Sequence, residues 1–137
     1  MAVTLRRRVD FPMIDYAQVV FYPEYFDLAH RFFEEAWLEI CGIDYPTITQ
    51  KMHLGFPAVR TESDHVAPLR YGDDIVCTLW IESVGNSSIT WCYRFENQDG
   101  LLCWNAKVVT VCVNMKTFEK QSVPQELAEA LRNCTEH

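Results

Sequence analysis

The longest helical pattern in the chain lies between residues 23 and 40. Apolar side chains recur there at intervals of three and four residues, which is the spacing of one face of an α-helix. Pro23 suits the first turn of such a helix, and Gly42 supplies its stop. Additional apolar residues such as Leu38 widen the stripe beyond one face, and His30 lies inside the stripe as a predicted core residue. We therefore expect the rest of the chain to enclose this helix.

The segments on either side of this helix have the pattern of β-strands. Strands are predicted over residues 3–11, 58–66, 75–84, 88–97 and 101–114, most of them rich in β-branched and aromatic side chains. Turn signals at residues 85–86 and 98–100 join the last three strands so tightly that they must be antiparallel neighbours. After the long helix, only strands are predicted until a short C-terminal helix over residues 124–134. Ser122 and Gln125 resemble a capping box at the start of that helix.

The order of these elements predicts how they pack. A strand, a long apolar helix and an antiparallel meander indicate a single α+β domain over residues 1–137. Its sheet must cover the helix, so we expect a curled antiparallel β-sheet wrapped around one long central α-helix. An exposed edge strand of such a sheet would favour pairing with a second copy of the chain.

The charge of the chain narrows the range of partners. The formal net charge is -7, so the surface as a whole repels a phosphate backbone and nucleic acid is not an expected partner. The only basic run, Arg6 to Arg8, is interpreted as part of an edge strand whose charges oppose aggregation. No stretch approaches the ~18 uninterrupted apolar residues of a membrane span, and no secretory leader is recognised, so no membrane association is expected.

The positions of the cysteines and histidines indicate the cellular compartment of the protein and whether it binds a metal ion. The chain has six cysteines but no Cys-x-x-Cys pair, and several lie within apolar strand-like runs, so they are interpreted as small buried hydrophobes. Free thiols of this kind favour a reducing, cytoplasmic location. No histidine pair has metal-ligand spacing, and neither a metal nor another cofactor is expected.

The segment DYAQVVFYPEYF, residues 15–26, has the strongest potential for chemistry. Asp15 lies in the loop before the long helix, and the first backbone amides of a helix are unpaired donors that can hold a carbonyl oxygen as it becomes negative. A carboxylate beside such donors can attack the carbonyl or draw a proton from water. An aspartate before a helix is nevertheless more often a simple cap or turn residue, so both interpretations stay open from the residues alone.

Two motifs resemble those of a known family. DYAQVVFYPEYF is similar to the signature of the 4-hydroxybenzoyl-CoA thioesterase family, in which an Asp, a small residue, a Val/Ile pair, an aromatic residue, Tyr-Pro and a further Tyr open the central helix. PLRYGDDI, residues 68–75, is similar to the Pro-x-x-x-Gly-Asp element that precedes a long strand in the same family. The likeness in element order covers nearly the whole chain.

The resemblance implies a fold, an activity and an assembly. It implies a hotdog fold, a homodimer or homotetramer, and metal-free hydrolysis of an acyl-CoA or acyl-carrier thioester. By position, Asp15 would be the nucleophile or general base, and the backbone amide of Tyr22 would polarise the thioester carbonyl. Phe21 and Tyr25 would border the acyl pocket, where aromatic walls suit an aromatic or medium-length acyl group.

The chain departs from some family members in one turn. Those members place Arg and Lys residues there, apparently to meet CoA phosphates, whereas this chain has VGNSS at residues 84–88. The identity of the acyl group is therefore left open. Lys51, Arg60, Arg70 and Lys107 are other candidates for phosphate contacts, although surface solubility explains each of them equally well.

Two other functions remain possible on the same fold. One is a non-catalytic acyl-binding module, and the other is a hotdog dehydratase or hydratase, which needs a histidine that reaches the reacting carbon. His53, in the loop before Gly55, is a candidate substrate contact, and His65 is a weaker one. The chain has neither a Gly-x-Ser-x-Gly elbow nor a glycine-rich phosphate loop. It therefore lacks the motifs that a serine hydrolase or a nucleotide-binding protein of these types needs.

Overall fold

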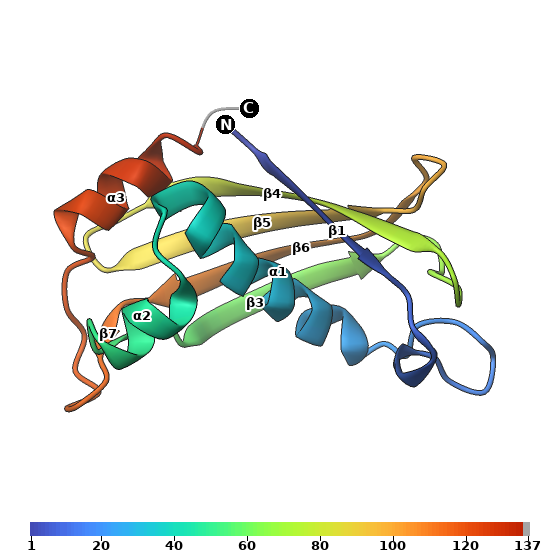
Figure 1. The fold of residues 1–137 in the computed structure, drawn as a ribbon, viewed down its shortest axis with the longest axis horizontal. Coiled ribbons are helices and arrows are strands. Elements are labelled where there is room, and N and C mark those ends of the chain that lie inside the picture. Colours follow the sequence, from blue (N-terminus) through green and yellow to red (C-terminus); the bar gives the residue numbers. More distant parts are fainter. Residues whose placement is uncertain (136–137) are drawn as a thin grey trace.

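The computed structural model describes residues 1–135 and places one long helix, α1 (Glu24–Cys41), across one face of an antiparallel sheet (Figure 1). The sheet has the strand order β1 (Val3–Arg8), β4 (Asp74–Val84), β5 (Ser88–Glu96), β6 (Leu102–Val111) and β3 (Ala58–His65). The remaining elements are η1 (Phe11–Met13), α2 (Tyr45–Gln50), β2 (Leu54–Gly55), β7 (Val113–Asn114) and α3 (Gln125–Arg132). The predicted α+β architecture is confirmed.

The middle of the sheet is the predicted meander. Strands β4, β5 and β6 pair antiparallel with their chain neighbours, and tight turns close them, with Gly85 N–H donating to Ser88 C=O at 2.8 Å. Gly100, in the next turn, has a φ of 80°, a conformation that glycine adopts without steric cost. Strands β1 and β3 form the two edges, so the basic run 6–8 does lie on an edge strand.

Three local features differ from the sequence prediction. The predicted strand 101–114 breaks at Cys112, because Val113 leaves the main sheet and pairs with Gly55 in the small β2–β7 sheet. Helix α2 was not predicted, although Asp44 caps it by accepting from Thr47 N–H at 2.9 Å. The strand predicted to end at residue 11 ends at Arg8, because the next residues lead into the short helix η1.

The predicted capping box of the C-terminal helix is also wrong. Pro124 is the N-cap of α3, and no side chain caps this helix. The Ser122 hydroxyl instead bonds to the Asn86 side chain at 3.1 Å, which ties the start of α3 to the β4–β5 turn. Proline at this position has no N–H for a capping partner to satisfy.

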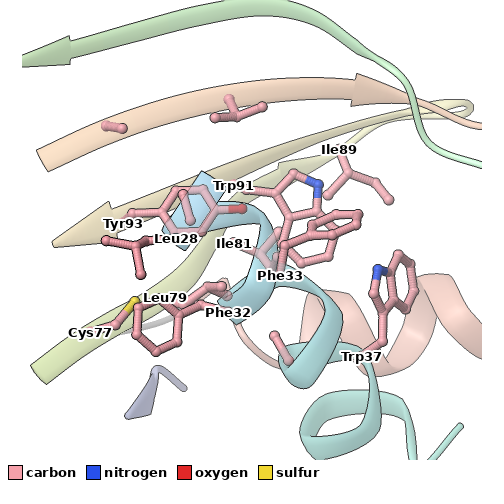
Figure 2. Close-up of a cluster of buried hydrophobic side chains, with 14 of the residues drawn as sticks. Leu28, Phe32, Phe33, Trp37, Cys77, Leu79, Ile81, Ile89, Trp91 and Tyr93 are labelled. Atoms are coloured by element: carbon pink, nitrogen blue, oxygen red, sulfur yellow. The ribbon is translucent and has the colours of Figure 1, made fainter. Parts of the chain in front are cut away.

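The core is formed where α1 meets β4 and β5. Figure 2 shows Phe32, Phe33 and Trp37 of α1 beside inward-facing side chains of these strands. The ring of Trp91 is 4.8 Å from that of Phe33 and 5.3 Å from that of Trp37, in edge-to-face geometry. Since aromatic side chains bury the largest apolar areas, this contact contributes much of the stabilisation of the fold.

Two expectations about α1 are corrected by its orientation. Leu38 is 53% exposed, because the seven buried residues already cover the side of the helix that faces the sheet. His30 is not a core residue, since its side chain is about half exposed and its Nε2 lies 2.8 Å from Glu34. The apolar face is thus wide, but the helix is not enclosed on every side.

The cysteines behave as buried thiols. All six are free, and five of them are buried. Burial raises the pKa of Cys92 and Cys112 to about 11 and that of Cys41 to about 12. No helix in the described part of the chain is long and apolar enough to cross a membrane.

Replacement of Trp37 by alanine should strongly destabilise the protein. The side chain is fully buried against four other aromatic rings, so its removal leaves a cavity that the helix cannot fill. We expect Trp37→Ala to lower the free energy of unfolding by about 3–5 kcal/mol in urea titrations. Leu38→Ala in the same helix is the control and should change it by less than about 0.5 kcal/mol. Equal effects of the two variants would contradict this packing.

The buried thiols predict a loss of stability in alkaline solution. Above pH ~9 the unfolded chain loses thiol protons that the folded chain retains, so rising pH favours unfolding. We expect the free energy of unfolding, measured in urea with a reductant, to fall as pH rises from about 9 to about 11. Cys112→Ala removes one buried thiol and should make this decline shallower. An identical slope in both proteins would show that Cys112 contributes nothing to it.

Candidate active site

The loop before α1 is held tightly at both ends. Val9 N–H donates to Asp73 C=O, and Val20 N–H donates to Leu69 C=O, each at 2.8 Å. Between these points the chain folds back on itself, so that Ile14 pairs with Val20. The segment that carries the predicted catalytic residue is therefore fastened to the connection between β3 and β4.

Asp15 lies in the tight turn of this loop and is exposed in the single chain. Its Oδ1 accepts a hydrogen bond from Ala17 N–H at 2.8 Å, and its own carbonyl accepts from Gln18 N–H at 2.9 Å. Gln18 has a φ of 67°, which lets the turn close. The bond to Ala17 fixes the direction of the carboxylate and leaves Oδ2 available for chemistry.

The backbone amide of Tyr22 faces no acceptor within residues 1–135. The N–H groups on either side are engaged, since Phe21 N–H donates to Met13 C=O at 3.0 Å and Glu24 N–H donates to Phe21 C=O at 2.8 Å. Pro23 has no N–H at all. Tyr22 N–H is thus an unused donor at the positive end of α1, the position that the sequence predicts for holding a carbonyl oxygen.

A small hollow of about 280 Å³ lies beside Tyr22. Tyr25 and His65 line it, and their rings are 4.8 Å apart in edge-to-face geometry. Tyr25 is buried, and its hydroxyl accepts a hydrogen bond from Leu69 N–H at 3.4 Å. Burial raises the pKa of Tyr25, so its phenol stays protonated. Among the predicted site residues, the fold therefore brings together Tyr22, Tyr25 and His65.

A larger cavity of about 520 Å³ runs along α1. Its walls come from α1, α2, the start of β3 and the inward faces of β5 and β6, and most of them are apolar or aromatic. Met115 crosses over Gly55 at one wall, where a Cβ on that glycine would overlap the Met115 thioether. A cavity of this size with few polar groups suits an apolar ligand.

The polar groups of the large cavity are mainly hydroxyls. Burial raises the pKa of Tyr93 well above its ordinary value. Burial and the nearby Glu34 carboxylate raise the pKa of Tyr45 to about 12. Both phenols therefore keep their protons at neutral pH and can donate hydrogen bonds. Sequence reasoning missed these residues, because strand alternation marks Tyr93 as inward-facing but says nothing about a cavity.

The hollow and the cavity are separate within one chain and share no lining residue. The rings of Tyr25 and Phe26 both pack on Trp104, at 5.5 Å and 5.2 Å, and fill the space between them. His65 lies at one end of β3 and Ala58 at the other, about 24 Å apart along an extended strand. The single chain therefore holds the unused Tyr22 amide and the large cavity apart.

The remaining predicted residues lie outside both spaces. Neither Asp15, Phe21 nor His53 lines the hollow or the large cavity. Phe21 packs edge-on against Tyr22, with ring centroids 5.3 Å apart. The carbonyl of His53 accepts from Met115 N–H at 2.8 Å, which fastens that loop to the segment after β7. His53 and His65 are thus not brought together.

The basic residues proposed for phosphate contacts are spread over the surface. Lys107 lies 2.8 Å from Glu82 and Arg60 lies 3.9 Å from Glu62, so carboxylates already neutralise these two charges. Residues 1–135 contain no group of three or more His, Cys, Asp or Glu side chains that could hold a metal ion.

Comparisons with known proteins agree with this geometry. A 1,4-dihydroxy-2-naphthoyl-CoA hydrolase from Nostoc punctiforme is 26% identical over 133 residues, which cover 96% of this chain and 87% of that protein. The crystal structure of a 1,4-dihydroxy-2-naphthoyl-CoA thioesterase from Synechocystis superposes with a TM-score of 0.86 over all of both chains, at 22% identity. A gentisyl-coenzyme A thioesterase superposes with a TM-score of 0.83 at 24% identity, over 91% of this chain and 98% of that one.

The family assignment follows from a sequence match as well as from the fold. The profile of the thioesterase superfamily matches residues 17–103, which run from the loop after Asp15 through α1 and into β6. The architecture of one helix on an antiparallel sheet is the expected hotdog fold, and the structural neighbours share it. The chain belongs to the thioesterase superfamily.

Proposed function

We propose that this protein hydrolyses the thioester of an aromatic acyl-CoA, releasing the aromatic acid and free CoA. The observation that carries the proposal is the cavity of about 520 Å³ beside α1, whose walls are mostly apolar and include several aromatic rings. Such walls suit a flat ring better than a charged or strongly polar acyl group. The relatives named for a 1,4-dihydroxy-2-naphthoyl-CoA support an aromatic substrate, which need not be 4-hydroxybenzoyl-CoA.

The geometry of the loop supports a mechanism centred on Asp15. Its Oδ2 can attack the carbonyl carbon directly or remove a proton from the attacking water. The carbonyl oxygen becomes negative as the new C–O bond forms, and Tyr22 N–H would donate a hydrogen bond to it. The C–S bond then breaks and the CoA thiolate leaves. If Asp15 is the base, the proton that it took from water moves to this thiolate. If Asp15 is the nucleophile, an acyl-aspartyl anhydride remains, and its hydrolysis by water regenerates Asp15 and supplies the thiol proton. The products are a carboxylic acid and a thiol, as the balance of hydrolysis requires.

A two-fold dimer would complete this site. Strand β3 is an edge of the sheet, so it can pair antiparallel with the β3 strand of a second copy. Antiparallel pairing brings the His65 end of one copy to the Ala58 end of the other. The Tyr22 amide of one subunit would then lie close to the large cavity of its partner. This arrangement supports a homodimer as the smallest active unit. The free thiols support a location in the reducing cytoplasm.

Neutralisation of Asp15 tests the mechanism. Asp15→Asn keeps the oxygen that accepts from Ala17 N–H, so the loop should retain its structure while losing its charge. We expect thiol release from a panel of aroyl-CoA substrates to fall by about 10²–10⁴-fold. The control is Asp99→Asn, which removes an exposed carboxylate in the β5–β6 turn and should leave activity unchanged. Full activity of Asp15→Asn would exclude Asp15 as nucleophile or base.

Mixed dimers test whether two subunits share one site. Ala58→Trp is expected to obstruct the cavity of its own subunit, and Asp15→Asn disables the carboxylate of its own loop. If each site uses the loop of one subunit and the cavity of the other, a purified mixed dimer has one intact site. Its activity should be about half that of the wild type, although both parent dimers are inactive. A mixed dimer as inactive as its parents would show that each subunit supplies a whole site.

A further inference from the structure

Among the described residues, Thr110 is the only buried one whose side chain is not aliphatic, aromatic or a thiol. It lies on β6, is 3% exposed, and forms part of the wall of the large cavity. Its neighbours in this region are aromatic rings and aliphatic side chains, such as Phe33 and Val108. A hydroxyl in such surroundings is costly unless it forms hydrogen bonds.

A tryptophan fixes the orientation of this hydroxyl. Trp91 Nε1–H donates a hydrogen bond to Thr110 Oγ1 at 2.9 Å, between β5 and β6. Figure 2 shows the ring nitrogen of Trp91 near Phe33, and Phe33 is one of the residues that line the cavity. The indole can only donate, so it uses a lone pair of the threonine oxygen and leaves the hydroxyl proton for another acceptor.

No acceptor for that proton is found among residues 1–135. Thr49, which also lines the cavity, donates its hydroxyl proton to the Pro46 carbonyl at 3.3 Å. The hydroxyl proton of Thr49 is therefore engaged, whereas that of Thr110 is not. Thr110 therefore offers a donor of fixed direction in an otherwise apolar wall. The phenols of Tyr45 and Tyr93 retain their protons in the same cavity and add donors to it.

We propose that Thr110 donates a hydrogen bond to an oxygen substituent on the aromatic ring of the acyl group, and so selects ring-oxygenated aroyl thioesters over unsubstituted ones. This inference rests on the proposed function, because it assigns the acyl group to the large cavity. An unsubstituted ring in that cavity would leave the hydroxyl without an acceptor. Discrimination by an unpaired buried polar group is stronger than discrimination by shape alone.

The test compares two substrates within each variant. The probes are 2-naphthoyl-CoA and its 1,4-dihydroxy counterpart, and the readout is the ratio of their kcat/KM values by thiol release. Thr110→Val should lower the preference for the hydroxylated substrate by about tenfold, the effect of one lost hydrogen bond. Thr110→Ser keeps the hydroxyl and should keep the preference. A ratio does not depend on how much of a sample is folded, so it remains interpretable for a less stable variant.

Two further variants guard against indirect effects. Thr110→Val leaves the Trp91 N–H buried without a partner, whereas combining it with Trp91→Phe removes both members of the pair and should show the same loss of preference. Thr90→Val, on the opposite face of the neighbouring strand, is the matched control and should leave the ratio unchanged. An unaltered ratio in both Thr110→Val proteins would overturn the inference but leave the proposed hydrolysis intact. Failure of the wild type to hydrolyse any aroyl-CoA would instead overturn both.

Discussion

The packing of α1 against the inward face of the sheet is the interaction on which the rest of this structure depends. Phe33 and Trp37 lie against Trp91, and this contact fixes both the rotation and the axial position of the helix. A helix held so firmly at its middle also has a fixed N-terminus. The unused amide of Tyr22 is therefore placed by the core, and the loop that carries Asp15 is placed by its bonds to the β3–β4 connection.

The same packing creates the binding space. Because α1 covers the sheet while β3 forms its outer edge, a cavity remains along the side of the helix that faces this edge. The chain alone holds the cavity and the loop with Asp15 at different places along α1, and the proposed antiparallel pairing of edge strands would bring them together. In the proposed dimer, the exposed edge strand would have a functional role, since the two parts of the proposed site would meet across it.

Polar groups in the cavity are few, so the proposed specificity would depend on a small number of donors. Trp91 holds Thr110 in place, and burial keeps the phenols of Tyr45 and Tyr93 protonated. Donors in an apolar space favour a ligand that carries oxygen at matching positions and disfavour one that does not. The core and the cavity wall thus share a residue, since Trp91 packs on α1 and also donates a hydrogen bond to the hydroxyl of Thr110 in the cavity wall.

The sequence by itself determined the parts of this protein that depend on local periodicity and turn chemistry. The long helix, the antiparallel meander and the loop with Asp15 follow from residues close together in the chain. Only the tertiary structure decided that the chain leaves the main sheet at Cys112, that His30 is about half exposed, and that His30, Tyr45 and Thr110 line one cavity. Those features arise where distant segments meet, and the free energy of such contacts leaves no periodic signal in the sequence.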